Sequence, residues 1–327
     1  MKFVKLCTVC IGFAAAAIAA ETPSPALLVL NKADQAMAIV DPASGQVVAR
    51  VGVGEGPHEV TVSADGKLAF VGNYGQQTPG RTISVIDLVA QKELRRVDLG
   101  PLRRPHGMFF AGGKVYFTAE ANRLVARYDP MTNQIDWLFG TGQATTHMVI
   151  ANPDVSRLFT SNIGSDSISA IERVSGPAGW TETVIPVGKG PEGIDWSPDG
   201  KEVWTATGGD GGVSIIDVET KKVIQTLSVG SKRTNRLKFT PDGKLVLLSD
   251  SQGNELIVLD RATKKERARI AMGRSPEGIQ MDPGGERAYV AQEGANDLAV
   301  IDLKTLTIAG HISPGNGPDG MAWAVRK

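Results

Sequence analysis

GKGPEGIDWSPDGKEVWTAT, at residues 188–207, is one copy of a pattern that recurs along most of the chain. Seven segments align with its first nine residues: GEGPHEVTV (54–62), LRRPHGMFF (102–110), ATTHMVIAN (144–152), GKGPEGIDW (188–196), SKRTNRLKF (231–239), GRSPEGIQM (273–281) and GNGPDGMAW (315–323). One residue of each segment is called its anchor here: it is the fifth residue in six segments and the fourth, His147, in ATTHMVIAN. Successive anchors are 48, 41, 45, 43, 42 and 42 residues apart. A period of about 40–45 residues is typical of β-propellers and repeat arrays.

Each unit has the composition of four short antiparallel strands. An apolar run follows the anchor, and three copies continue into the turns SADGK (63–67), SPDGK (197–201) and TPDGK (240–244). Asp-Gly between apolar runs is a strong hairpin signal. The later runs, such as LAFVGN (68–73) and ISVIDL (83–88), are rich in β-branched, aliphatic and aromatic residues and show no extended helical period.

The two ends of the chain complete one unit between them. The last copy contains only its first strand, at 319–325, and three further strand-like runs lie near the N-terminus, at 26–31, 36–41 and 46–51. Joining them closes a ring and hides the strand edges that an open array would expose, whereas a linear solenoid would show atypical capping repeats. The sequence therefore predicts an all-β fold, a seven-bladed β-propeller that forms a single domain over residues 21–327.

The first part of the chain, residues 1–20, has the features of a cleavable signal peptide. Two lysines precede an apolar run at 6–18, and a small-residue pattern, AIA, stands just before the expected cleavage point. We therefore expect a periplasmic or secreted protein. Cys7 and Cys10 are the only cysteines and both lie in this segment, so the mature chain is expected to have no disulfide, thiolate metal site or cysteine nucleophile.

Composition excludes several other classes of protein. The 327 residues include 35 basic and 35 acidic side chains and are 42% hydrophobic. A net charge of zero argues against a nucleic-acid partner, which requires a basic excess. After the signal segment no apolar run approaches the roughly 18 residues that span a bilayer. We expect a monomer that does not cross the membrane.

The anchor positions differ in chemistry from copy to copy. In chain order they are His58, His106, His147, Glu192, Asn235, Glu277 and Asp319. Each is expected to begin the innermost strand of its blade, at one mouth of a narrow central channel. Features shared by all copies serve the blade, so residues that vary at this mouth are the candidates for function.

Three of the four histidines occupy consecutive anchors, which makes a metal site one interpretation. Imidazoles of His58, His106 and His147 that converge on one ion would suit Zn or Cu. The carboxylates on the other side of the ring would suit a harder ion such as Ca. Histidines at this position also have a purely structural interpretation, in which each hydrogen-bonds the neighbouring blade.

An organic ligand at the same face is the alternative to a metal ion. Polar side chains of mixed sign that do not repeat are typical of a small-ligand mouth. The candidate ligand-binding residues are Glu192, Asn235, Glu277, Asp319, Arg104 and Arg236. The partner expected at this mouth is a small molecule or a protein.

The repeat also resembles a known family. The pattern SVID…KVV…IxVGxxPxGIxxSPDGKxxYVAN, read across residues 25–327, resembles the YVTN-repeat β-propellers, which are usually exported in bacteria. The resemblance is specific for the fold and implies several functions. Relatives of this type include ligand-binding periplasmic propellers, surface-layer propellers and propeller subunits of quinone-dependent amine dehydrogenases.

Three functions follow as expectations. The first is a periplasmic module that binds a ligand, a metal ion or a protein at the channel mouth. The second is a metal-dependent hydrolase similar to lactonase propellers, although those use Glu, Asn and Asp ligands where this chain has three histidines. The third is the propeller subunit of a quinone-linked dehydrogenase. G-x-S-x-G, phosphate-loop and H-E-x-x-H motifs are all absent from the sequence.

Overall fold

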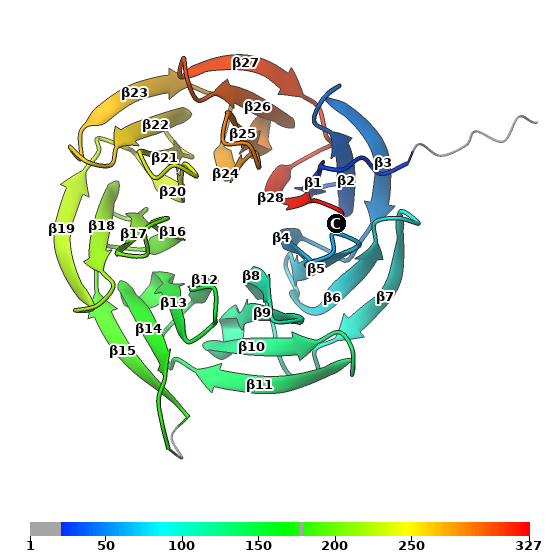
Figure 1. Cartoon of the computed structure of the whole chain (residues 1–327), viewed down its shortest axis with the longest axis horizontal. Helices are drawn as coiled ribbons and strands as arrows, with labels where there is room; N and C mark the ends of the chain where they lie inside the picture. The colour runs from blue at the N-terminus through cyan, green and yellow to red at the C-terminus, as the bar shows by residue number, and fades with distance from the viewer. Residues whose placement is uncertain (1–20, 177–178) are drawn as a thin grey trace, which may run out of the picture.

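The computed structural model describes residues 21–176 and 179–327, and in this part of the chain the strands form seven four-stranded antiparallel sheets. The sheets are arranged as blades around a central channel, with one strand of each blade at the channel and one at the rim (Figure 1). The predicted seven-bladed β-propeller is confirmed. The predicted signal peptide, residues 1–20, lies outside the described residues.

Each blade has four strands, which run in order from the innermost strand at the channel to the outermost strand at the rim. The innermost strands are β28 (Pro318–Ala324), β4 (Pro57–Val62), β8 (Pro105–Ala111), β12 (Thr146–Ala151), β16 (Pro191–Trp196), β20 (Thr234–Phe239) and β24 (Pro276–Met281). The second strands are β1 (Ala26–Asn31), β5 (Leu68–Gly75), β9 (Lys114–Ala119), β13 (Arg157–Asn162), β17 (Glu202–Thr207), β21 (Leu245–Asp250) and β25 (Arg287–Gln292).

The outer half of each blade completes the sheet. The third strands are β2 (Ala36–Asp41), β6 (Pro79–Asp87), β10 (Leu124–Asp129), β14 (Ser167–Arg173), β18 (Gly212–Asp217), β22 (Glu255–Asp260) and β26 (Asp297–Asp302). The outermost strands are β3 (Gln46–Gly52), β7 (Lys92–Asp98), β11 (Gln134–Gly140), β15 (Trp180–Pro186), β19 (Lys222–Ser228), β23 (Glu266–Ala271) and β27 (Thr307–Ile312). Single 3₁₀ turns follow β9, β13 and β25, as η1 (Glu120–Asn122), η2 (Ile163–Ser165) and η3 (Glu293–Ala295).

The ring is closed by strands from the two ends of the chain, as predicted. β28 pairs antiparallel with β1, with Ala324 opposite Ala26 and Ala322 opposite Leu28. The blade order is β28-β1-β2-β3, so one C-terminal strand and three N-terminal strands make one sheet. This pairing satisfies the inner edge of β1 and ties the ends of the ring together.

The hydrophobic core lies between neighbouring blades. Middle strands such as β1 are buried along their whole length, whereas the rim strand β11 alternates between exposed and half-buried positions. Leu28 and Ile39 of one blade pack in one cluster with Val71 and Ile86 of the next. Because each blade buries apolar side chains on both faces, the innermost strands are held in a fixed ring, and their polar ends have fixed positions.

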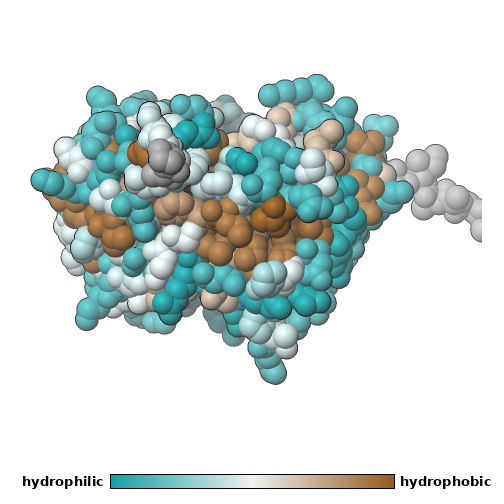
Figure 2. Space-filling model, turned by 90° about the horizontal axis from the view of Figure 1, so that it is seen from below, coloured by the Kyte–Doolittle hydropathy of each residue, from teal (hydrophilic) through white to brown (hydrophobic). Residues whose placement is uncertain are grey.

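The side of the ring seen in Figure 2 is mostly polar. Figure 2 views the ring from its side and shows hydrophilic residues around a band of apolar ones at mid-height. In the described parts of the chain, no helix has both the length and the apolar character needed to cross a membrane.

Candidate functional site

A cavity of about 370 Å³ opens at one mouth of the channel. All seven anchors line it, so the prediction that they share one mouth is confirmed. Arg236 also lines this cavity, but Arg104 does not: its guanidinium lies over the ring of Tyr74, 4.5 Å from the ring centre.

Irregular pairing at the start of the innermost strands aims the anchors at the mouth. In β20 the register against β21 shifts between Thr234 and Leu237, and Asn235 and Arg236 stand in the interval. Equivalent shifts occur in β4, β8, β12, β16 and β24. A bulge of this kind breaks the strict alternation of side chains, so the anchor and the residue after it can both face the channel axis.

The residue after the anchor separates two kinds of blade. Four copies have glycine there, and a Cβ on Gly193 would lie 2.5 Å from the Asn235 carbonyl oxygen of the next blade. The other three copies have Glu59, Met148 and Arg236. Arg236 Nη2 lies 2.7 Å from Glu59 Oε1, and Arg236 Nη1 donates to Met148 Sδ at 2.9 Å. The three side chains that replace glycine therefore contact one another in the channel, through Arg236.

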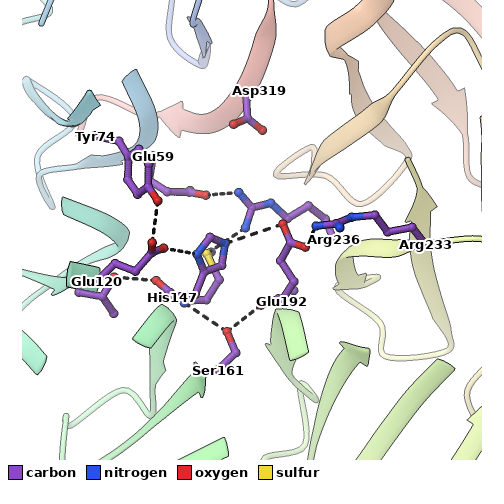
Figure 3. Close-up of polar contacts among 12 residues, drawn as sticks. Glu59, Tyr74, Glu120, His147, Ser161, Glu192, Arg233, Arg236 and Asp319 are labelled. Atoms are coloured by element: carbon purple, nitrogen blue, oxygen red, sulfur yellow. Dashed lines mark hydrogen bonds and ion pairs between the residues drawn. The ribbon is translucent and has the colours of Figure 1, made fainter. Parts of the chain in front are cut away.

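This contact separates two cavities. Arg236 lines both the anchor mouth and a larger cavity of about 620 Å³ at the opposite face, which Glu59 and Met148 also line. Figure 3 shows the Arg236–Glu59 pair reaching between opposite walls of the channel. The anchor mouth therefore has a charged floor.

The three histidines occupy one side of the mouth and pack ring to ring. The ring centres of His58 and His106 lie 5.1 Å apart, and those of His106 and His147 lie 3.8 Å apart in a stacked arrangement. Burial lowers the pKa of His58 to about 4. Burial, and then the charge of His147, holds the pKa of His106 well below its ordinary value. His58 and His106 are therefore neutral at pH 7.

His147 is held from behind by a buried carboxylate. Its Nδ1 lies 2.7 Å from Glu120 Oε2, and the Tyr74 hydroxyl donates to Glu120 Oε1 at 2.6 Å (Figure 3). Burial acts to raise the pKa of Glu120, but the hydrogen bond and charge of His147 outweigh it and the pKa is lowered. With Nδ1 committed to Glu120, Nε2 of His147 points to Glu192, whose Oε1 is 3.9 Å away.

Carboxylates gather on the other side of the mouth. Lys32 Nζ lies 2.7 Å from Glu293 Oε2 and 3.3 Å from Asp319 Oδ2. Burial opposes ionisation of Asp319, but the charges of Lys32 and Arg236 lower its pKa to about 2. Burial, and then the charge of Asp319, raises the pKa of Glu277 to about 8. Two acids at one mouth are thus held in opposite protonation states at pH 7.

Three polar atoms at the mouth lack a hydrogen-bond partner among the described residues. They are His106 Nδ1, His147 Nε2 and Asn235 Oδ1, and each is shielded from solvent. The side chains that carry them belong to residues that are at most 7% exposed. A buried polar group without a partner costs about 1–3 kcal/mol, so this wall of the mouth is incomplete as a hydrogen-bonding surface.

The described residues contain no group of three or more His, Cys, Asp or Glu side chains that is arranged to hold a metal ion. Stacking of His106 on His147 explains this for the histidines, because stacked rings direct their nitrogens side by side. Three imidazoles bind one ion only when their nitrogens converge at about 2 Å from it. A metal ion at these histidines remains a proposal that requires the rings to turn.

Several residues of the mouth were not predicted from the anchors alone. Lys32 directly follows β1, Tyr74 lies near the end of β5, and both line the cavity. Glu59 carries its own sequence signal, because it replaces the glycine that follows the anchor in other copies. His311 is exposed at the rim, where it pairs with Asp297 and does not approach the mouth.

The sequence of the chain matches a known family of β-propellers. A sequence profile described as YNCE-like beta-propeller matches residues 3–176 and, in a second overlapping match, residues 143–322. The chain belongs to this family. The resemblance to YVTN-type propellers is thereby confirmed for this YNCE-like propeller, and the family defines its fold without defining a ligand. A search of curated proteins found no match.

Solved structures similar to this YNCE-like propeller have diverse functions. Hydrazine synthase of Kuenenia stuttgartiensis has a TM-score of 0.70 and 19% identity, covering 83% of this chain and 93% of the other. The periplasmic gluconolactonase of Pseudomonas aeruginosa has a TM-score of 0.75 and 18% identity, covering 93% and 100%. A functionally unknown protein of Desulfotomaculum acetoxidans has a TM-score of 0.77 and 10% identity, covering 93% and 100%. At these identities the likeness shows the fold alone.

Proposed function

We propose that this YNCE-like propeller is an exported binding module that takes up a small polar organic molecule at its anchor mouth. The observation that carries the proposal is the cavity at this mouth, which is lined by all seven anchors and by charged side chains of both signs. In its wall, polar atoms of His106, His147 and Asn235 lack partners, and a ligand that turns these side chains toward itself and pairs them recovers the cost of leaving them unpaired.

The shape of the mouth supports a ligand of limited size. The cavity volume of about 370 Å³ lies within the range of small-molecule sites, which is roughly 300–1,000 Å³. The Arg236–Glu59 pair provides a floor, so a bound molecule contacts walls on several sides. A soluble ligand entering from one face would leave by the same face.

The proposed export of the protein implies a role outside the cytoplasm. Export is inferred from the charged and apolar pattern of residues 1–20. The similar gluconolactonase of Pseudomonas aeruginosa is described as periplasmic, which is a parallel in fold and compartment. Fractionation of cells that produce the full chain tests this part, and protein found only in the cytoplasm would contradict it.

Binding is tested by thermal denaturation of the purified protein with a panel of neutral, cationic and anionic polar compounds. We expect at least one class to raise the melting temperature of the parent and to have less effect on Asn235→Ala. His311→Ala is the control, because His311 lies outside the mouth. Two results would count against the mouth as a binding site. In the first, no compound stabilises the parent; in the second, the compounds stabilise Asn235→Ala as much as His311→Ala.

A divalent transition metal is the second candidate occupant, because two of the unpaired atoms are imidazole nitrogens of adjacent blades. The test is metal content of the purified protein, together with denaturation in added Zn or Cu. Metal binding at these residues should weaken in His106→Ala and persist in His311→Ala. A parent protein that holds no metal and gains no stability from either ion excludes this candidate.

A further inference from the structure

We propose that the ligand of the anchor mouth is a small hydroxylated amine, and that Glu277 is the carboxylate that receives its ammonium group. The inference rests on the proposed function, because it names the chemical class of molecule that the same cavity would take. The evidence for it is a comparison of the charged side chains at the mouth, which shows which of them already have an ion-pair partner.

Every other carboxylate at or behind the mouth has a partner. Asp319 and Glu293 share Lys32, and Glu192 Oε2 lies 2.9 Å from Arg233 Nη2. The carboxylates of Glu120 and Glu59 are engaged by His147 and Arg236, respectively.

Glu277 differs from these groups. Among the described residues it has no ion-pair partner, and its one hydrogen bond comes from the Ser275 hydroxyl at 3.1 Å. It stands on β24 and lines the cavity. An uncommitted carboxylate in a cavity wall is a place where a ligand cation can form a charge-assisted hydrogen bond.

The charges around Glu277 favour a cation over an anion. Asp319 on β28 and Glu192 on β16 act on it as negative charges, and Lys32 and Arg236 act as positive ones. Both of these cations are already engaged, Lys32 by two carboxylates and Arg236 by Glu59. Without a bound ligand, Glu277 keeps its proton at pH 7. An ammonium placed beside it would offset the negative charges of Asp319 and Glu192 and favour the ionised form of Glu277, so binding releases that proton. A ligand carboxylate would instead add a further negative charge.

The remaining unpaired atoms favour hydroxyl groups. Asn235 Oδ1 is an acceptor that requires a donor from the ligand, and His147, whose Nδ1 is engaged by Glu120, has its Nε2 without a partner among the described residues. A hydroxyl can pair with either atom, because it can both donate and accept a hydrogen bond. Hydroxyl groups supply donors without adding charge, so a compact molecule with one ammonium and several hydroxyls satisfies Glu277, Asn235 and His147 together.

Three linear polyols of the same length test the charge preference: glucamine, sorbitol and gluconate, which carry positive, zero and negative charge near neutral pH. Calorimetric titration of the purified protein should give the tightest binding for glucamine and the weakest for gluconate. In Glu277→Gln we expect glucamine to lose at least about tenfold in affinity, while sorbitol changes little. Glu286→Gln, an exposed acid outside the mouth, is the matched control.

Added salt gives a second measurement that needs no variant. Because salt screens attraction between charges, it should weaken glucamine binding to the parent and leave sorbitol binding nearly unchanged. Equal affinity for glucamine and sorbitol, or a glucamine preference that survives Glu277→Gln, would overturn the amine inference and leave the binding function standing. Failure of all three polyols to bind also overturns the inference, and the wider panel then decides the proposed function separately.

Discussion

Arg236 on β20 and Glu59 on β4 form an ion pair across the channel, 2.7 Å apart, although 177 residues separate them in sequence. The two side chains are mostly buried, with 10% and 14% of their surface exposed. Both occupy positions that hold glycine in other copies of the repeat. The pair is therefore built from departures from the repeat, and it gives the anchor mouth its floor.

Removing one member of this pair should destabilise the ring. Arg236→Met leaves Glu59 buried without a cation, and loss of one partner from a buried pair typically costs about 3–5 kcal/mol. We expect a correspondingly lower free energy of unfolding in urea. The double variant Arg236→Met with Glu59→Gln should recover most of the loss, because no uncompensated charge remains. A double variant as unstable as the single one would show that packing of the Arg236 stem, and not charge, sets the stability.

Closure of the ring predicts the effect of deleting its last strand. Without residues 318–327, β1 loses the pairing that runs from Ala26 opposite Ala324 to Asn31 opposite Pro318. An exposed apolar strand edge is prone to intermolecular pairing. We expect the truncated protein to aggregate and to lose its cooperative thermal transition, as measured by light scattering and circular dichroism. A soluble truncation with a parent-like transition would contradict closure as the source of stability.

The unpaired nitrogen of His106 should make the mouth less stable than an apolar version of it. His106→Phe keeps a ring to stack on His147 and removes the buried unpaired Nδ1. We expect a higher melting temperature and, at the same time, weaker binding of any ligand that stabilises the parent. His311→Phe at the exposed rim is the control, and it should change neither property. A destabilised His106→Phe protein would show that the present ring is better satisfied than its contacts indicate.

The sequence predicts the scaffold well because the scaffold is repeated. Seven copies of one pattern reveal the blade, and the orphan strands at 26–31 and 319–325 reveal the closure, since an unpaired edge must be covered. The shared register also places His58 and Glu277 at the same mouth. Each of these inferences depends on backbone features that every copy has in common.

The interior of the mouth is harder to predict because bulges decide it. A strict two-residue alternation would turn the residue after the anchor away from the channel, but the shifted register in β20 leaves both Asn235 and Arg236 on its inner side. The stacking of His106 on His147 is likewise a matter of side-chain rotation, which no spacing records. One signal in the sequence does locate the floor of the mouth. Three copies of the repeat replace the glycine that follows the anchor, with Glu59, Met148 and Arg236.

The raised pKa of Glu277 predicts how stability depends on pH. Burial and the charge of Asp319 raise this pKa from its ordinary 4.5 to about 8 in the folded protein. Below pH 4.5 the carboxyl is protonated in both states and carries no penalty. As pH rises from 4.5 to about 8, the unfolded chain ionises this group while the folded protein retains its proton, so the group's contribution to stability falls.

Glu277→Gln removes that dependence while keeping the size of the side chain. Between pH 5 and pH 8 the parent should lose on the order of 1–3 kcal/mol of unfolding free energy relative to the variant. The measurement is urea denaturation of both proteins at several values across this interval, with Glu286→Gln as the exposed control. Parallel curves for the parent and Glu277→Gln would mean that Glu277 ionises normally in the folded protein. Glu277 would then have a cation partner or contact with water that is absent from the contacts described above. The assignment of Glu277 as the unpaired acid of the mouth would be wrong.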